Sequence, residues 1–403
     1  MKFSSRILNI KPSPTLEVTA LANAMKAKGI DVIGFGSGEP DFDTPQSIKD
    51  AAVRAIESGK TKYTPAGGIA ELKKAIVHKF KRDNALEYAT SEVIVNNGGK
   101  HSFYNLMQVL LDPGEEVLIP APYWVSYPDM VMLAGGTPII IETSRDSGYK
   151  ITPQQLQAAI TKQTRAIVIN SPSNPTGATY SRDELSALAE VLVQHDILLI
   201  SDDIYESILY DGNAFVNIAN LSEELKKRSV VLNGVSKAYS MTGWRIGYMA
   251  GDESLIKKID ILQSQSTSNP TSISQWASVE ALMGDQRVIA EMVNAFDRRR
   301  RIIVNGLNEI PGFDCIMPPG AFYAFPDIDG VTRLPGWKSI VERYPGPYAS
   351  STLTSYLLEE ARVAVVPGIA FGIDRNIRLS FATSDDNIIE GVSRMKEVVG
   401  RLI

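Results

Sequence analysis

The sequence predicts an α/β protein with a mainly parallel central sheet flanked by helices, plus a smaller α/β domain. Short runs rich in β-branched residues alternate with longer helical patterns, which is typical of a parallel sheet covered by helices. The 403 residues are enough for one large and one smaller domain. No repeat or low-complexity tract interrupts this alternation.

The individual elements follow from local patterns. Apolar residues at helical spacing predict a helix over Ser181–His195, and Ser181 followed by Glu184 fits a capping box at its start. A further helix is expected over Ile289–Leu307, followed by mixed strands. The expected strands are Glu92–Asn96, Glu116–Ile119, Arg165–Asn170, Ile197–Ser201, Ser229–Leu232, Phe322–Phe325 and Arg375–Phe381.

Composition and charge exclude several classes of function. Forty-one basic and 46 acidic residues give 41 − 46 = −5, which disfavours nucleic-acid binding because phosphate backbones require a basic face. We interpret the basic run Arg298–Arg301 as a solvated helix surface. Neither a secretory signal nor a membrane span is evident. The single Cys315, interpreted as a small buried apolar residue, suits a reducing, cytoplasmic location.

Polar clusters follow three of the predicted strands. They are the segments 171–177, Asp202–Tyr205 and Asn233–Lys237. Open parallel sheets bind ligands outside the carboxyl ends of their strands, so these clusters outline one site. Most lysines are solvated surface residues. However, Lys237 follows a buried-looking strand, and an apolar setting lowers the pKa of a lysine and makes its amine a nucleophile toward carbonyl groups.

The residues around Lys237 resemble a known family. Ser236-Lys237 followed by Met241–Tyr248 is similar to the Schiff-base signature of fold-type I, class I pyridoxal-phosphate aminotransferases. The similarity is greatest to the bacterial aspartate aminotransferase subgroup that includes some prephenate aminotransferases. Further matching segments run along nearly the whole chain: 38–45, 62–64, 98–100, 122–124, 174–177, Asp202, Tyr205 and Arg378.

This resemblance implies a fold and a domain organisation. The fold would be the PLP-transferase fold type I. Residues 1–45 would form an N-terminal arm and part of the small domain, residues 46–285 the large PLP-binding domain, and residues 286–403 the small C-terminal domain. The resemblance also implies a homodimer with shared active sites, in which Tyr63 reaches the cofactor phosphate of the partner subunit.

The resemblance also assigns residues to the ring of pyridoxal 5'-phosphate. Lys237 would hold the cofactor as a Schiff base, and Asp202 would keep the pyridine nitrogen protonated. Asn174 and Tyr205 would hydrogen-bond the phenolic oxygen, and Trp124 would stack on the ring. Helix capping for Asp202, turn formation for Asn174 and core packing for Trp124 are the structural alternatives.

For the phosphate, the resemblance points to the start of a helix and an arginine. The amides of Gly99 and Lys100 would bind the anion at a helix N-terminus, and Arg245 would add a permanent charge. Ser236 is a further candidate. Many relatives carry Ser three residues before the lysine, where this chain has Gly234. The family's Glu after the aspartate is also replaced, here by Asp203.

For the substrate, Arg378 resembles the arginine that binds the α-carboxylate, with Gly38, Trp124 and Asn174 nearby. Without the resemblance, a lone strand arginine would be read as solvent-exposed. Lys100 and Lys11 resemble cations that favour a distal carboxylate, although either can be a surface lysine. The implied reaction is transamination of aspartate with 2-oxoglutarate, with prephenate as a further acceptor.

Two alternatives remain open on the sequence. One is a PLP-dependent lyase or decarboxylase of the same fold, because no motif fixes which bond at the α-carbon breaks. The other is a non-catalytic PLP-binding regulator, but such regulators usually carry an N-terminal DNA-binding module, and this chain starts almost directly with its family-like segment. The three widely spaced histidines, His78, His101 and His195, argue against a metal site.

Overall fold

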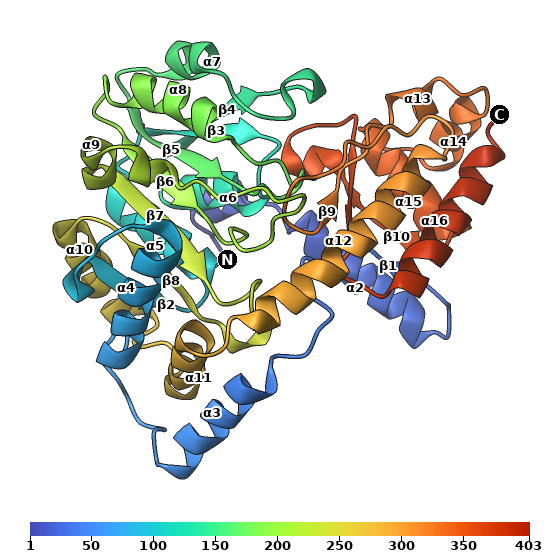
Figure 1. Cartoon of the computed structure of the whole chain (residues 1–403). Coiled ribbons are helices and arrows are strands. Elements are labelled where there is room, and N and C mark those ends of the chain that lie inside the picture. Colours follow the sequence, from blue (N-terminus) through green and yellow to red (C-terminus); the bar gives the residue numbers. More distant parts are fainter.

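The computed structural model describes residues 1–403 and contains two bodies, one around a seven-stranded sheet and one around a three-stranded sheet (Figure 1). The large sheet has the order β2-β8-β7-β6-β5-β3-β4, and only β8 runs antiparallel to its neighbours. The predicted α/β fold with a mainly parallel sheet is therefore confirmed. Its strands are β2 (Val93–Asn96), β3 (Glu116–Ala121), β4 (Thr137–Glu142), β5 (Thr164–Asn170), β6 (Leu198–Asp202), β7 (Ser229–Gly234) and β8 (Gly247–Ala250).

Five of these strands lie where the sequence predicts them, with ends shifted by up to two residues. The strands β4 and β8 were not predicted. β8 begins inside the segment that carries the lysine motif and continues two residues beyond it, and its four residues are all buried. The alternation of β4 is weak, because most of its side chains are half-buried or exposed at the edge of the sheet.

Helices cover both faces of the large sheet, because successive strand residues point to opposite sides. Ile200 and Val230 pack toward α5, α6 and α10, whereas Leu199 and Val231 pack toward the helices of the other face. The predicted capping box at Ser181 is present at the start of α8. The helices of this body are α3 (Gln46–Glu57), α4 (Ala70–Asn84), α5 (Gly99–Leu110), α6 (Ser126–Leu133), α7 (Pro153–Ala159), α8 (Arg182–Leu192), α9 (Glu223–Lys227), α10 (Glu253–Ser266) and α11 (Ser272–Met283).

The second body combines both ends of the chain. β1 pairs in parallel with β10, so the segment before the large sheet joins the C-terminal part. The long α12 leads from α11 into this body (Figure 1). Its elements are α2 (Pro14–Ala27), β1 (Ile33–Gly34), α12 (Arg287–Asn308), β9 (Tyr323–Ala324), α13 (Asp329–Thr332), α14 (Trp337–Arg343), α15 (Ala349–Glu360), β10 (Val363–Ala364), β11 (Val366–Pro367), β12 (Ile377–Ser380) and α16 (Asp385–Gly400).

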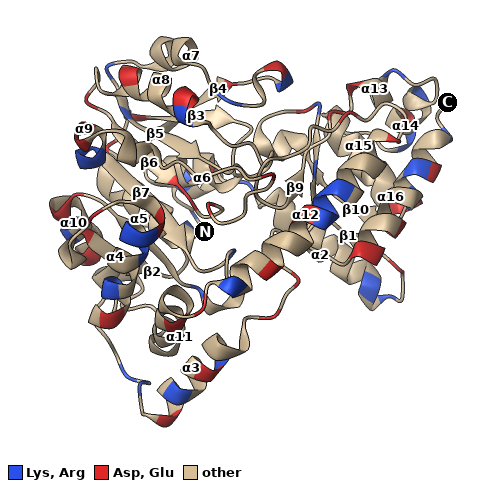
Figure 2. Cartoon of the chain, viewed as in Figure 1, with Lys and Arg blue, Asp and Glu red and all other residues tan.

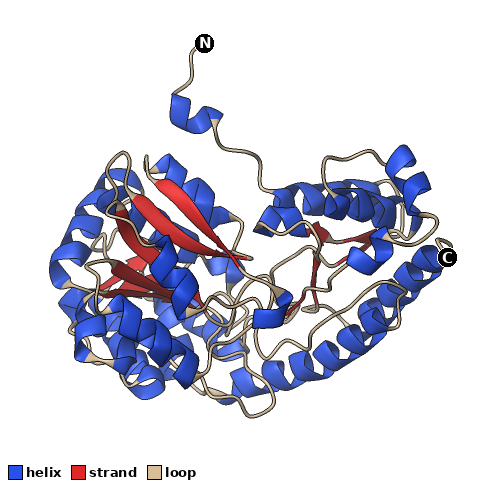
Figure 3. Ribbon diagram, turned by 90° about the horizontal axis from the view of Figure 1, so that it is seen from above, coloured by secondary structure: helices blue, strands red, loops and turns tan.

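Viewed from above, the N-terminal segment with α1 (Ser5–Leu8) projects away from the second body (Figure 3), and Arg6 of α1 donates to the carbonyl oxygen of Leu133, at the end of α6, over 3.4 Å. None of the helices combines the length and the apolar character that a bilayer crossing requires. Cys315 is buried, as predicted, and burial raises the pKa of its thiol to about 12. The division of the chain at residues 45 and 285 stays a prediction.

The structure corrects the interpretation of the basic run Arg298–Arg301 as a solvated helix surface. Basic residues gather on α12 in Figure 2, but only part of the run faces solvent. Arg299 is 6% exposed and forms a bidentate pair with Asp41, while Arg300 is 0% exposed and pairs with Asp211. The interpretation as a solvated surface was wrong for these two arginines, because aspartates from distant segments of the chain reach α12 and pair with them.

Candidate active site

The carboxyl ends of β5, β6 and β7 open into a cavity of about 270 Å³. Residues of the second body close its other side, including Arg378 on β12 and Tyr323 on β9. The two predicted site residues that do not line this cavity are Tyr63 and Lys11. The predicted residues that do line it are Gly38, Gly99, Lys100, Trp124, Asn174, Asp202, Tyr205, Ser236, Lys237, Arg245 and Arg378.

Asp202 lies at the end of β6, and its carboxylate is held by two donors. The hydroxyl of Tyr127 donates to Oδ2, and the amide of Ile204 donates to Oδ1 over 3.3 Å. Burial raises the pKa of Asp202, while these two hydrogen bonds and the charge of Lys237 oppose the rise. Asp202 is the last residue of β6, precedes a turn that begins at Ile204 and caps no helix, so its carboxylate is available to a ligand.

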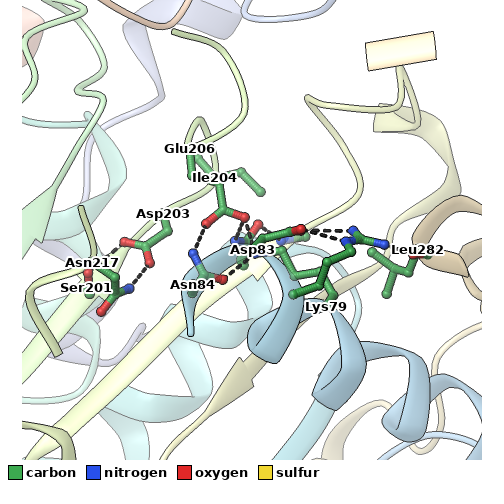
Figure 4. Close-up of polar contacts among 12 residues, drawn as sticks. Lys79, Asp83, Asn84, Ser201, Asp203, Ile204, Glu206, Asn217 and Leu282 are labelled. Carbon is green, nitrogen blue, oxygen red and sulfur yellow. Dashed lines mark hydrogen bonds and ion pairs between the residues drawn. The ribbon is translucent and has the colours of Figure 1, made fainter. Parts of the chain in front are cut away.

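A buried polar network surrounds the segment that follows Asp202 in the chain (Figure 4). Glu206, four residues further along, accepts a hydrogen bond from Lys79, one from Asn84 over 2.6 Å and one from Asn233 over 2.9 Å. The side chains of Lys79 and Glu206 are only 5% and 7% exposed. Asn233 is the next-to-last residue of β7, the strand that leads to Lys237, so this network ties the turn after β6 to the end of β7.

Asp203, which replaces the family's usual Glu, belongs to the same buried region (Figure 4). It accepts hydrogen bonds from the Ser201 hydroxyl, over 2.6 Å, and from the Asn217 amide. Burial, and then the charge of Glu206, raise its pKa well above the usual value. Asp203 is absent from the cavity wall. The replacement of the family's Glu by Asp203 therefore affects the buried hydrogen bonds around the site and not the surface that a ligand would contact.

Lys237 points into the cavity. Its Nζ donates to the carbonyl oxygen of Gly38 over 2.6 Å. The pKa of Lys237 is lowered to about 8, mainly by burial and also by Arg378 and Arg245, while Glu39 and Asp202 oppose the decrease. About a tenth of the amine is therefore unprotonated at pH 7, and this is the form that attacks carbonyl groups.

One end of the cavity is suited to an anion. Helix α5 begins at Gly99, and the first amides of a helix have no acceptors within it. Arg245 lies against this helix start, since a Cβ on Gly98 would fall 2.3 Å from its Nη2. Ser236 lines the cavity next to it. At Gly234 a Cβ would lie 3.1 Å from the carbonyl oxygen of Ile246, so the backbone here is closely packed.

A second anion-binding group lies at the opposite side. Arg378 is 2% exposed, contrary to the reading as a lone solvent-facing arginine. Its Nη1 donates to Asn174 over 2.9 Å and its Nη2 to the Gly36 carbonyl over 2.7 Å. The buried Nε has no hydrogen-bond partner. Such an unsatisfied charged donor at a cavity wall fits a carboxylate ligand.

The candidate cations for a distal carboxylate lie at the mouth of the cavity. Lys100 is exposed, and its ammonium lies 5.3 Å from the ring centroid of Trp124. Its pKa is lowered by partial burial and by Arg245, and is raised by Asp129. Lys11 is exposed and close enough for its charge to act on Asp129.

A family model described as "Aminotransferase class I and II" matches residues 30–395 of this chain. The chain belongs to this family.

The similarity to individual aminotransferases extends over the whole chain. Aspartate aminotransferase of Bacillus subtilis (strain 168) is 52% identical over 99% of each chain. The aspartate/prephenate aminotransferase of Nitrosomonas europaea is 53% identical over 99% of this chain and 100% of that protein. The crystal structure of an aspartate aminotransferase from Rhizobium meliloti superposes with a TM-score of 0.95 at 48% identity, over 100% of both chains.

Aminotransferases of this family depend on pyridoxal phosphate, and the cavity of this chain fits that group. A buried carboxylate suits a basic ring nitrogen, an amine of lowered pKa suits an aldehyde, and a helix start beside an arginine suits a phosphate. Asp202, Lys237 and Arg245 supply these groups within one cavity.

The structure adds site residues to this aminotransferase that motif reasoning missed. Tyr127 and Tyr323 bond to predicted residues that lie 75 and 118 positions away in the sequence. Ser13 and Leu16, at the start of α2, line the mouth of the cavity. No local pattern marks these residues, because their proximity depends on how the two bodies pack.

Proposed function

We propose that this protein transfers the amino group of an acidic L-amino acid, converting L-aspartate and 2-oxoglutarate into oxaloacetate and L-glutamate. Prephenate is included as a further amino acceptor, because several similar proteins are named aspartate/prephenate aminotransferases. The observation that carries the proposal is the convergence of Lys237, Asp202 and Arg378 on one cavity. An amine, a carboxylate and an unsatisfied guanidinium suit a cofactor and an amino-acid carboxylate together.

Each side chain has a distinct task in this proposal. Lys237 would hold pyridoxal phosphate covalently, with Asp202 at the ring nitrogen, Asn174 and Tyr205 at the phenolic oxygen, and Trp124 on the ring. The amides of Gly99 and Lys100, with Arg245 and Ser236, would bind the phosphate. The bound cofactor supplies a ring system that withdraws electrons from the substrate's α-carbon.

The substrate and its proton are handled by the chain itself. Arg378 would bind the α-carboxylate through two parallel hydrogen bonds, beside the backbone of Gly38. When it is not bound to the cofactor, Lys237 Nζ would act as the base that removes the α-proton and delivers a proton to the carbon on the other side of the substrate nitrogen. Lys237 Nζ donates to the carbonyl oxygen of Gly38. This contact supports a base on the same side of the cavity as the proposed binding site of the α-carboxylate.

The preference for acidic substrates is assigned to Lys100, with Lys11 as a second cation. Both lie at the mouth of the cavity, away from Arg378 (Lys11 just outside its wall), where the second carboxylate of aspartate would extend. A solved structure of a Thermus thermophilus aspartate aminotransferase carries maleate, a dicarboxylate, and its chain is 41% identical with a TM-score of 0.91.

The proposal includes a cytoplasmic homodimer. Tyr63 is 93% exposed and lies outside the cavity of its own chain, as expected for a residue that reaches the phosphate of the partner subunit. The single, buried Cys315 suits a reducing compartment.

The decisive experiment incubates the purified protein, loaded with pyridoxal phosphate, with aspartate and 2-oxoglutarate. We expect glutamate and oxaloacetate in equal amounts, and pyridoxamine phosphate after aspartate alone. Formation of alanine or release of carbon dioxide without glutamate would instead indicate a decarboxylase. Release of ammonia would indicate a lyase, and cofactor binding without turnover of any amino acid a regulator.

A further inference from the structure

Tyr323 is a fully buried residue of the second body that reaches into the cofactor side of the cavity. Its side chain is 0% exposed in the folded chain, yet it contributes to the cavity wall. Its hydroxyl lies 2.6 Å from the hydroxyl of Tyr205. No other hydrogen bond of either hydroxyl is present, so the two form a closed pair in which one hydroxyl donates to the other.

The same tyrosine touches two more site residues. Its ring centroid lies 4.6 Å from the guanidinium carbon of Arg378, on the strand paired with its own. A Cβ on Gly38 would fall 2.7 Å from the Tyr323 hydroxyl, so glycine is required there as long as the hydroxyl is present. Because Gly38 also accepts the hydrogen bond of Lys237, the Tyr323 hydroxyl lies where the cofactor and substrate groups meet.

We propose that Tyr323 is a positioning residue that donates its hydroxyl proton to Tyr205 and thereby leaves the Tyr205 hydroxyl proton free to point into the cavity. The inference rests on the proposed function, in which Tyr205 donates to the phenolic oxygen of pyridoxal phosphate. A hydroxyl has one proton, so Tyr205 can donate to the cofactor only if its partner supplies the proton of the shared hydrogen bond.

The surroundings of the pair favour this direction. Burial raises the pKa of both hydroxyls, and Arg378 opposes the rise at both. The guanidinium of Arg378 lies 4.6 Å from the centroid of the Tyr323 ring, and a cation this close favours the ionised form of a phenol and so makes its hydroxyl a better donor. Chains of hydroxyls also polarise one another, so a donor behind Tyr205 strengthens its own hydrogen bond to a ligand.

The test is a pH titration of the absorbance of the lysine-linked cofactor in the loaded enzyme. Removal of a donor to an ionised oxygen raises the proton affinity of the linked nitrogen, so Tyr205→Phe should move the midpoint upward by on the order of one pH unit. Tyr323→Phe should move it in the same direction by roughly half as much. The double variant should match Tyr205→Phe alone, because Tyr323 acts through Tyr205.

The control is Tyr356→Phe, which removes a buried hydroxyl of the second body that bonds to Val398 over 2.8 Å, outside the cavity. It should leave the midpoint unchanged. An unchanged midpoint in Tyr323→Phe, or shifts that simply add in the double variant, would overturn the inference while the proposed function stands. A wild-type protein that forms no lysine-linked cofactor would overturn both.

A larger residue at Gly38 is a second test of the role of the Tyr323 hydroxyl. Gly38→Ala should push the Tyr323 hydroxyl away and raise the titration midpoint. Without that hydroxyl, the nearest Tyr323 atom to the new Cβ is 3.7 Å away, which is an ordinary contact. Gly38→Ala should therefore add no further shift in the Tyr323→Phe background. An equal shift in both backgrounds would contradict the inference.

Discussion

The cofactor end and the mouth of the cavity differ in how their polar groups are held. At the cofactor end, Asp202 is bonded to Tyr127, and the turn that carries it is fixed by Glu206, Lys79 and Asn233. At the mouth, Lys100 and Lys11 are exposed, and no carboxylate lies within ion-pair distance of either. One end is prearranged by buried partners, and the other is left adjustable.

This difference has consequences for catalysis and for specificity. Groups fixed before the ligand binds lose little freedom on binding, so they can stabilise a charged transition state effectively. Flexible surface lysines contribute a modest, salt-sensitive attraction. Substitutions should therefore have large effects at the cofactor end and small, substrate-dependent effects at the mouth.

The largest effect is expected for Lys237→Ala. Loss of the amine removes the covalent attachment of the cofactor and the base that moves the α-proton, so turnover should fall by at least about a thousandfold. The absorbance of the lysine-linked cofactor should disappear in the same protein. Steady-state assays and spectra measure both, and substantial retained turnover would contradict the assigned role. Lys81→Ala, an exposed lysine of α4, is the matched control.

The second effect concerns the stability of the network behind Asp202. Lys79→Met leaves the buried Glu206 carboxylate without a cation, which should lower the free energy of unfolding by about 3–5 kcal/mol. Urea unfolding followed by circular dichroism measures the change. Lys81→Met, on the same helix but in an exposed pair with Glu87, should leave the unfolding midpoint unchanged.

The double variant Lys79→Met, Glu206→Gln removes both charges and should be more stable than Lys79→Met alone. If Lys79→Met is as stable as the wild type, the network does not hold the cofactor end in place, and the contrast between the two ends loses its physical basis.

The sequence predicted the two ends unequally. The strands β5, β6 and β7 are short apolar runs followed by polar clusters, so the position of Lys237 and Asp202 at one sheet edge was predictable. Glu206 looked like any turn residue, because its partners on α4 and β7 are distant in the sequence.

The same limit explains the arginine run on α12. Arg299 and Arg300 are buried only because Asp41 and Asp211 are brought against this helix by segments far along the chain. Local charge patterns cannot reveal such pairing. At the mouth, the start of α2 reaches the cavity from the N-terminal segment, and no motif marked Leu16 as part of the wall.

A third prediction concerns the pH dependence of the cofactor end. The cofactor-free protein should capture pyridoxal phosphate with a rate that rises about tenfold per pH unit and levels off near the Lys237 pKa of about 8. Below that pKa the unprotonated, reactive fraction of the amine falls about tenfold per pH unit. Borohydride reduction would fix the captured cofactor on its lysine, and mass analysis of the peptides would then measure the amount attached to Lys237 separately from other lysines.

A substitution at Glu39 is a control for this pH profile, because the direction of its effect on the pKa of Lys237 is known. Its negative charge raises the pKa of Lys237, so Glu39→Gln should lower that pKa and move the profile to lower pH. A profile still rising at pH 10 would show that Lys237 behaves as a solvated lysine, and the cofactor end would then be no more prearranged than the mouth.

The smallest effect is expected at the mouth, for Lys100→Ser. Loss of one exposed charge should raise the KM for aspartate by about five- to tenfold, with a much smaller change for an aromatic amino acid. The effect should shrink at high salt, because exposed charges are screened. Lys162→Ser, an exposed lysine absent from the cavity wall, should leave both KM values unchanged. Equal increases for both substrates would contradict the assignment of Lys100 to the distal carboxylate. In that case Lys11 would be the remaining cation to test, since its charge also reaches Asp129 at the same mouth.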